Sequence, residues 1–283
     1  MLDFTTTVPS TRIMSLKYTN KLAGKRVLVL GGTSGIGFCV AENALENGAT
    51  VIVASSRQSS IDSTLARLRQ SYPELANNAR GHTIDLRSTN SENSIIELLA
   101  AATNNGKDKL DHIVHTAGDN LSLQTINKFE GADVLLAAQR VRLLAPMFLA
   151  KHAPGKYMNK SSHSSLTFTG GVNTHSPGIG WSIPALIGGA QQGLVRALAI
   201  DVRPIRVNLV EPGAIDTELF ERTFTGDQLE AFRNAYKEQT LTGEIGAPQD
   251  MSETYLYCMR DGYLTGQSVL SDGGLLLALG AKR

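Results

Sequence analysis

The most constraining feature of this sequence is a short apolar run that leads directly into a cluster of glycines. Residues 26–30 have the length of a buried strand, and Gly31, Gly35 and Gly37 follow at once. Apolar residues then recur at helical spacing from Ile36 onward. We therefore predict a strand, a tight turn and a helix, which form the first half of a nucleotide-binding βαβ unit.

The glycines of this turn predict an anion site. Glycine permits a sharp reversal of the chain and lets backbone N–H groups approach a pyrophosphate, which would lie at the helix N-terminus. The Gly31-x-x-x-Gly35-x-Gly37 spacing differs from the more common G-x-G-x-x-G. Without its flanking strand and helix, such a turn would equally suit an ordinary flexible loop. The expected cofactor contacts from this turn are Gly31, Thr33, Ser34, Gly35, Ile36 and Gly37.

Composition narrows the class of protein. The chain has 283 residues, of which 42% are hydrophobic and 19% are charged, and its net charge is +1 with a pI near 7.8. This balance argues against nucleic acid or an anionic membrane as the main partner. Cys39 and Cys258 are too few and too scattered for a disulfide framework or a metal site. We expect no metal, and two buried thiols in a reducing compartment.

No linker rich in Pro, Gly or Ser divides the chain, so we predict a single domain over residues 22–283. The polar segment 1–21 has no long apolar run, and we expect a flexible N-terminal extension and a cytoplasmic protein. Alternating strand and helix patterns predict a Rossmann-type α/β fold, a doubly wound parallel sheet of seven strands. The expected strands are 26–30, 50–54, 81–85, 110–116, 165–169, 205–210 and 267–271, and later helices are expected at 134–150, 190–202 and 249–259.

The end of the second strand predicts which cofactor the chain binds. Ser55, Ser56 and Arg57 stand where NAD-binding proteins carry an acidic residue for the ribose 2′-hydroxyl. A guanidinium beside two hydroxyls attracts a 2′-phosphate, so NADP(H) is the favoured cofactor. The alternative is that Arg57 is a solvated surface residue. Asp85 ends the predicted third strand and precedes Leu86, and its carboxylate could accept from an adenine amino group or cap a turn.

Several later motifs each follow a predicted strand. They are Thr116-Ala117-Gly118, Ile205-Arg206-Val207-Asn208 and Pro212-Gly213-x-x-x-Thr217. With the glycine turn and Asp85, they make the chain from about residue 22 onward resemble the short-chain dehydrogenase/reductase (SDR) family. The resemblance implies that Thr116, Ala117 and Gly118 lie beside the adenosine ribose. It further implies that residues 218–240 form a substrate lid, and that the nicotinamide and pyrophosphate meet Pro212, Gly213, Ile215 and Thr217.

The catalytic centre departs from that family. Its members act through an Asn-Ser-Tyr-Lys group, and counting along the motifs places Arg142, Gly171, Pro184 and Gly188 at these positions. Carbonyl reduction needs a proton for the oxygen, and losing its donor costs a factor of roughly 100 to 10,000 in rate. An iminium carbon accepts hydride without a proton. The replacements therefore favour C=N⁺ chemistry, or no redox chemistry at all.

Arg142, Trp181 and Asp119 are the candidate catalytic residues. Arg142 would place a fixed cation with up to five donors in the cavity, or would form a structural ion pair under the nicotinamide loop. Trp181, the only tryptophan, could stack on a flat or cationic substrate, or anchor its loop in the core. Asp119 is a candidate for proton handling. The sequence does not rank it against Asn120, Asn173, His175 and Glu211.

The Thr-Ala-Gly turn, Arg142 and the Gly180-Trp181 loop also resemble a fungal natural-product subgroup of the SDR family. Its members include reductase-derived Diels–Alderases and a Pictet–Spenglerase of indole-alkaloid pathways, which bind NADP(H) and lack the usual tetrad. Those Diels–Alderases use an acidic residue on the loop before the tryptophan, and residues 177–180 contain none. The resemblance implies an NADP(H)-binding enzyme that acts on an imine or iminium alkaloid intermediate, by cyclisation, hydride transfer or both.

Two alternatives stay open at this point. One is an ordinary NADPH-dependent ketoreductase that uses a distant tyrosine such as Tyr263, and the other is a catalytically silent NADP(H)-binding protein. In each case we expect a small-molecule ligand, an indole alkaloid for the favoured reading, and neither nucleic acid nor membrane. The leucines at 275, 276, 277 and 279 suggest a subunit contact, so a homodimer or homotetramer is expected.

Overall fold

Seven parallel strands form one sheet in the computed structural model, which describes residues 17–281. Most of the expected N-terminal extension lies outside the described residues. The spatial order is β3-β2-β1-β4-β5-β6-β7, so the predicted doubly wound sheet is confirmed. The strands are β1 (Arg26–Leu30), β2 (Thr50–Ser55), β3 (Ala79–Thr83), β4 (His112–His115), β5 (Ser165–Thr169), β6 (Arg206–Pro212) and β7 (Ser268–Ser271).

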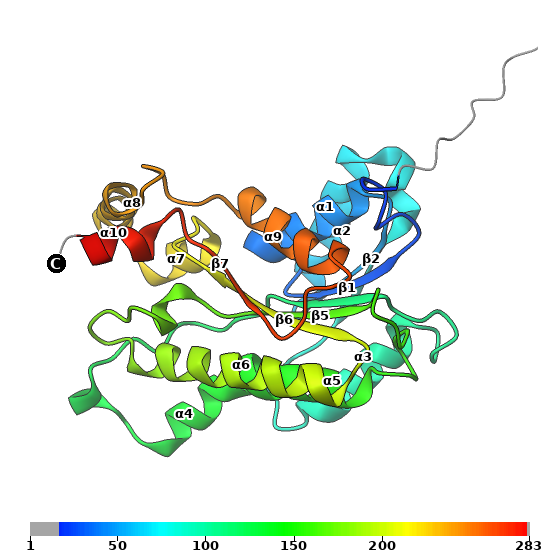
Figure 1. Ribbon diagram of the computed structural model, residues 1–283, viewed down its shortest axis with the longest axis horizontal. Coiled ribbons are helices and arrows are strands. Elements are labelled where there is room, and N and C mark those ends of the chain that lie inside the picture. The colour runs from blue at the N-terminus through cyan, green and yellow to red at the C-terminus, as the bar shows by residue number, and fades with distance from the viewer. Residues whose placement is uncertain (1–16, 282–283) are drawn as a thin grey trace, which may run out of the picture.

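Helices cover both faces of the sheet (Figure 1). One layer contains α1 (Gly35–Glu46), α2 (Gln58–Ser71) and α9 (Pro248–Arg260), and the other contains α3 (Ser91–Ala102), α5 (Ala145–His152) and α6 (Ser182–Asp201). The strands contribute side chains to the core on both sides of the sheet, because successive side chains point to opposite faces. Leu28 and Leu30 of β1 pack into the core on the α3, α5 and α6 side, and Val27 and Val29 pack into the core beneath α1, α2 and α9.

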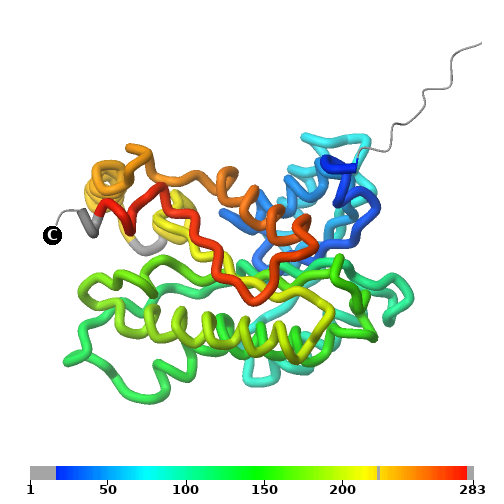
Figure 2. Tube along the Cα trace, in the orientation of Figure 1, coloured from blue at the N-terminus to red at the C-terminus, as the bar shows by residue number. Residues whose placement is uncertain are grey.

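A third group of helices gathers where the strands end. Helices α7 (Glu218–Thr223), α8 (Asp227–Gln239) and α10 (Leu275–Ala281) lie together at one end of the molecule, at the left of Figure 1. The trace in Figure 2 shows the C-terminal segment turning back beside α8, which α10 contacts. In open α/β sheets, ligands bind outside the carboxyl ends of the strands, near the point where strand order reverses. Here that point lies between β1 and β4.

The long helix expected at 134–150 is present, because helical residues run without a gap over 132–152, but a π turn interrupts its α-helical hydrogen bonding. Helix α4 (Ala132–Gln139) passes through a π turn over Arg140–Leu144 before α5 begins. Pro146 explains the interruption. Proline has no backbone N–H, so the carbonyl of Arg142, four residues earlier, cannot receive its helical hydrogen bond. The Ala145 N–H instead reaches back five residues to the Arg140 carbonyl.

Two further boundaries differ from expectation. Helix α6 begins at Ser182 rather than 190, because Pro184 falls in its first turn, where backbone N–H groups have no helical partner to lose. Strand β3 ends at Thr83, so Asp85 lies in the following turn.

Helix α6 is also long and apolar enough to span a membrane by length and composition alone. In the structure it contacts β6 and the π turn, as a covering helix of the sheet does.

Two histidines of β4 are buried as neutral rings. The His112 Nδ1 lies 2.9 Å from the Ser165 hydroxyl, and His115 packs edge-on to Phe168. Burial lowers the pKa of His112 to about 3 and that of His115 to about 4. An unfolded histidine has a pKa of about 6.5, so below that pH the unfolded chain binds protons that the folded protein excludes.

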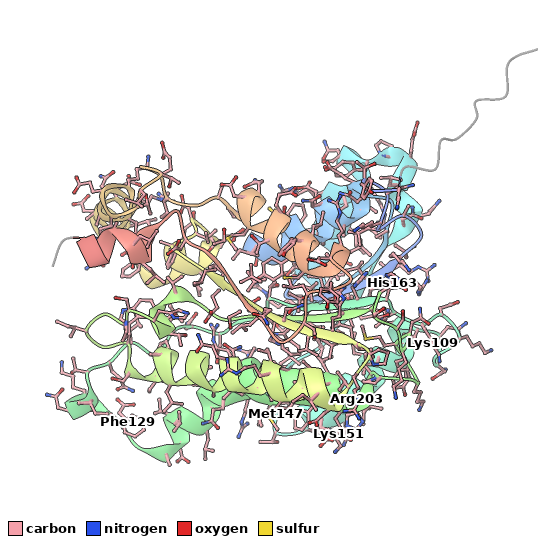
Figure 3. All side chains as sticks on the ribbon, viewed as in Figure 1. Lys109, Phe129, Met147, Lys151, His163 and Arg203 are labelled. Atoms are coloured by element: carbon pink, nitrogen blue, oxygen red, sulfur yellow. The ribbon has the colours of Figure 1, made fainter. Side chains whose placement is uncertain are left out.

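We therefore expect the free energy of unfolding to fall as the pH drops from about 6.5 toward 4, by up to about 1.4 kcal/mol per pH unit for each histidine. Urea unfolding at pH 7, 6 and 5 measures this slope. His112→Asn should flatten it, while His163→Asn should leave it unchanged, because His163 is exposed at the end away from α7, α8 and α10 (Figure 3). An equal slope in His112→Asn and the wild type would contradict the assignment.

Candidate active site

One cavity of about 1050 Å³ opens at the carboxyl ends of the strands. Every residue selected from the sequence as a cofactor contact lines it, from five separate segments of the chain. These residues are Gly31, Thr33, Ser34, Gly35, Ile36, Gly37, Ser55, Ser56, Arg57, Asp85, Leu86, Thr116, Ala117, Gly118, Pro212, Gly213, Ile215 and Thr217. The candidate catalytic residues Asp119, Arg142 and Trp181 line the same cavity. The fold therefore brings both groups together.

The glycine turn packs closely against the loop after β4. A Cβ atom on Gly31 would lie 2.6 Å from the Ala117 nitrogen, and a Cβ on Gly37 would collide with the Gly31 carbonyl and the Thr116 hydroxyl. Helix α1 then starts with no side-chain cap on its N-terminus and no acidic residue in its first turn. The helix N-terminus lies at the cavity wall, a position that fits a diphosphate.

The end of β2 forms the next part of the wall. The Thr33 hydroxyl donates to the Ser55 hydroxyl at 3.0 Å, which ties the glycine turn to the strand end beside exposed Arg57. Asp85 caps its own turn, because its Oδ1 accepts from the Arg87 backbone N–H at 3.0 Å and from the Arg87 Nε at 3.2 Å. These bonds lower the pKa of Asp85. One carboxylate oxygen of Asp85 therefore caps a turn, as the second alternative expected. The residue also lines the cavity.

Arg142 forms an ion pair in the wall of the cavity. Its Nε donates to Asp119 Oδ1 at 3.1 Å, and its Nη2 donates to the Asp119 carbonyl at 2.8 Å. The guanidinium lies against Gly118, where a Cβ would approach Nη2 within 2.7 Å. Both side chains are largely buried, with 19% and 24% of their surface exposed. Arg142 thus forms an ion pair with Asp119 of the loop after β4, and the pair is part of the cavity wall.

The π turn that carries Arg142 is held by a side chain from α6. Gln191 of α6 donates from Nε2 to the Arg142 carbonyl at 2.9 Å and to the Thr169 carbonyl at 3.0 Å. Two carbonyl acceptors identify the Gln191 nitrogen, since the amide oxygen cannot donate. Sequence reasoning missed Gln191: Pro146 marks the Arg142 carbonyl as unpaired, but no signal in the sequence shows that Gln191, 49 residues away, binds it.

The catalytic positions inferred by counting also reach the cavity. Gly171, Pro184 and Gly188 line it, beside the half-buried Trp181, whose indole packs against Gly178. Among the described lining residues there is no lysine, and the one tyrosine is Tyr236 of α8. Tyr263 is 97% exposed and lies outside this wall.

Helices α7 and α8 supply an aromatic wall. Phe232 stacks between Phe224 and Tyr236, with ring centroids 4.7 and 4.6 Å away, and Phe220 lies 4.5 Å from it. Phe220 and Tyr236 line the cavity. Arg233 of α8 binds both carboxylate oxygens of Asp216, in the loop that also carries Ile215 and Thr217.

The remaining predicted polar residues separate into two sets. Asn120 and Asn173 line the cavity, whereas His175 and Glu211 are not among its lining residues. Among the C-terminal leucines, Leu275 and Leu276 line the cavity, and Leu277 is 72% exposed.

Comparison with known proteins places the chain among its relatives. A family model described as an SDR-like Rossmann domain matches residues 18–278. The chain belongs to the short-chain dehydrogenase/reductase family. An SDR from Acremonium, ucsE, is 41% identical over 268 residues, covering 94% of this chain and 100% of the relative. The SDR malC of Malbranchea aurantiaca is 38% identical over 264 residues, covering 90% of this chain and 96% of the relative.

Solved SDR structures share the fold. The MalC Reductase/Diels-Alderase from Malbranchea aurantiaca aligns with a TM-score of 0.86 at 36% identity, covering 92% of this chain and all of that chain. A 3-oxoacyl (acyl-carrier-protein) reductase from Agrobacterium tumefaciens, solved with NADP bound, aligns with a TM-score of 0.79 at 22% identity, covering 93% and 98% of the two chains. The relatives are reductases and a Reductase/Diels-Alderase, so the match supports an enzyme.

The Gln191 bridge generates a stability prediction. In Gln191→Leu, the Arg142 and Thr169 carbonyls lose their donor, and leaving such acceptors unsatisfied costs about 1–3 kcal/mol each. We expect a fall of that order in the free energy of unfolding, measured with urea. Arg196→Leu is the matched control, because Arg196 is exposed on the same helix. Equal stability in the two variants would show that the bridge contributes nothing.

Proposed function

We propose that this SDR binds NADP(H) and acts on an imine or iminium alkaloid intermediate of fungal secondary metabolism, by hydride transfer, cyclisation or both. The observation that carries the proposal is a nucleotide cradle joined to a reaction chamber lined by Gly171, Pro184 and Gly188. No lysine lines the chamber among the described residues. The similarity to a Reductase/Diels-Alderase adds support.

Residues of the cradle have separate tasks in this proposal. The first N–H groups of α1 bind the diphosphate, and Arg57 with Ser55 and Ser56 binds the 2′-phosphate. Thr217 and the Ile215 backbone position the nicotinamide. A bound NADPH supplies a hydride.

The chamber residues act on the substrate. The Arg142–Asp119 pair presents a fixed cation whose charge is balanced locally, so it orients a polar substrate group by hydrogen bonding. Trp181 and the aromatic wall of Phe220 and Tyr236 stack on a flat ring and exclude water, with α7 and α8 acting as the lid. When hydride reaches an iminium carbon, the C=N π electrons become the nitrogen lone pair. No side chain has to deliver a proton.

The cofactor assignment makes a first prediction. Arg57→Ala should raise the Kd for NADPH by about 10- to 100-fold, because a charge-assisted hydrogen bond contributes about 1.5–3 kcal/mol, and should leave the Kd for NADH unchanged. Nicotinamide fluorescence titration measures both constants. Arg69→Ala, at the far end of α2, is the control and should bind both cofactors as the wild type does. Equal affinity of Arg57→Ala and the wild type for NADPH would remove the 2′-phosphate assignment.

The reaction assignment makes a second prediction. With NADPH, the protein should reduce the indole-fused imine 1-methyl-3,4-dihydro-β-carboline, in its protonated form, at least 100-fold faster than cyclohexanone. Absorbance at 340 nm follows the reaction, and product analysis with and without NADPH detects ring closure that consumes no cofactor. Arg142→Ala should reduce turnover, whereas Arg140→Ala should not, because Arg140 is not a lining residue of the cavity and bonds the Arg87 carbonyl.

Two results would overturn the proposal in favour of its alternatives. Ketone turnover as fast as imine turnover would indicate an ordinary ketoreductase with an unrecognised proton donor. Cofactor binding with no effect on the imine, and none from Arg142→Ala, would indicate a silent NADP(H)-binding protein.

We also infer a homo-oligomer, because apolar side chains stand exposed on α6 and α10. Leu186 is 50% exposed, Ile200 is 64% exposed and Leu277 is 72% exposed. Burying such residues against a second copy would remove them from water.

A further inference from the structure

The turn after β5 places one side chain in the space that a neighbouring glycine leaves open. Gly171 has no side chain, and a Cβ atom there would collide with the Asn173 carboxamide oxygen. Asn173 belongs to the single helical turn Val172–Thr174 and lines the cavity. Its carboxamide therefore occupies the region that any side chain at 171 would fill.

The next residue of the turn is held by a second glycine. A Cβ on Gly188 of α6 would collide with the Thr174 hydroxyl, so Thr174 packs into a notch on the helix. The Thr174 hydroxyl is buried and has no hydrogen-bond partner among the described residues. A buried unpaired hydroxyl is unfavourable, so the fit into the notch, rather than a polar contact, holds Thr174 in place.

The third residue is held by a buried carboxylate. The His175 Nε2 lies 3.1 Å from Glu211 Oε2, and Gln192 Nε2 donates to Glu211 Oε1 at 2.9 Å. Glu211 is fully buried near the end of β6, and both of its oxygens are engaged. The residues that follow Asn173 are thus fixed to α6 and to β6. A side chain held in this way reaches a ligand with little loss of conformational freedom.

We propose that Asn173 is a substrate-contacting residue of this cavity, which binds a carbonyl or amine N–H group of the substrate through its carboxamide, and that Gly171 and Gly188 are glycine to admit this turn. The inference rests on the proposed function, which supplies a substrate at this end of the cavity. A carboxamide donates and accepts hydrogen bonds but does not ionise, so it orients a substrate without transferring a proton. This property suits a reaction at an iminium carbon.

Asn173→Ala tests the contact directly. It should raise the KM for 1-methyl-3,4-dihydro-β-carboline, and the calorimetric Kd of this probe for the cofactor-free protein, by about 2- to 10-fold, as expected for one neutral hydrogen bond. The Kd for NADPH should stay within twofold of the wild type. An unchanged KM and probe Kd would overturn the proposal.

Gly171→Ala tests the role of the glycine. The added methyl group should displace the carboxamide and reproduce the effect of Asn173→Ala, and the double variant should be no worse than either single one. Additive effects would show that Gly171 acts through something other than Asn173. Gly188→Ala should likewise raise the probe Kd. Its control is Gly189→Ala, because a Cβ on Gly189 meets nothing within 4 Å and should leave the probe Kd unchanged.

These measurements distinguish a failure of the proposed function from a failure of the role assigned to Asn173. If the wild type binds the probe with no NADPH oxidation and no cyclised product, the reaction assignment fails, while the calorimetric constants still decide the role of Asn173. If the wild type does not bind the probe, both fail. Thermal unfolding of each variant separates loss of contact from loss of fold, since only a structural defect would lower the Tm together with NADPH affinity.

Discussion

The reaction end of this protein depends on one backbone carbonyl that its own helix cannot use. Pro146 removes the donor that would have bonded the Arg142 carbonyl, and the helix relaxes into a π turn. Gln191 takes over that carbonyl and joins it to the end of β5. Because Arg142 lies within the π turn, the same bridge determines where its guanidinium meets Asp119. A helix defect, a buried amide and a cavity ion pair thus form one unit.

The two ends of the cavity are built on different principles. At the nucleotide end, the backbone forms the wall: glycines allow close packing of the turn, and the N-terminus of α1 lies at the cavity. At the reaction end, side chains from β4, the π turn, the turn after β5 and the lid converge on one chamber. A backbone cradle tolerates changes in neighbouring side chains. The chamber can therefore change its chemistry while the cradle keeps its ligand.

Sequence reasoning predicted what local patterns determine. The strands β1 and β5 have the predicted bounds, since an apolar run bounded by turn residues determines a strand. The seven-stranded sheet and the convergence of the selected residues followed from strand order. Long-range pairing could not be predicted. Nothing near Gln191 shows which carbonyl it binds, and the contact of Asn173 with Gly171 depends on how the turn closes. The π turn could have been predicted, because Pro146 marks the carbonyl that loses its helical hydrogen bond. The apolar pattern of residues 134–150 is continuous, however, and indicates an uninterrupted helix.

The notch at Gly188 also limits which residues can occupy this position. The Thr174 side chain fills the volume in which any larger residue at 188 would have to begin. A substitution of Gly188 by a residue such as lysine would first have to expel a turn that is fixed to α6 and to buried Glu211. Introducing a larger side chain at 188 would therefore require coordinated replacement of several residues of this turn and of α6.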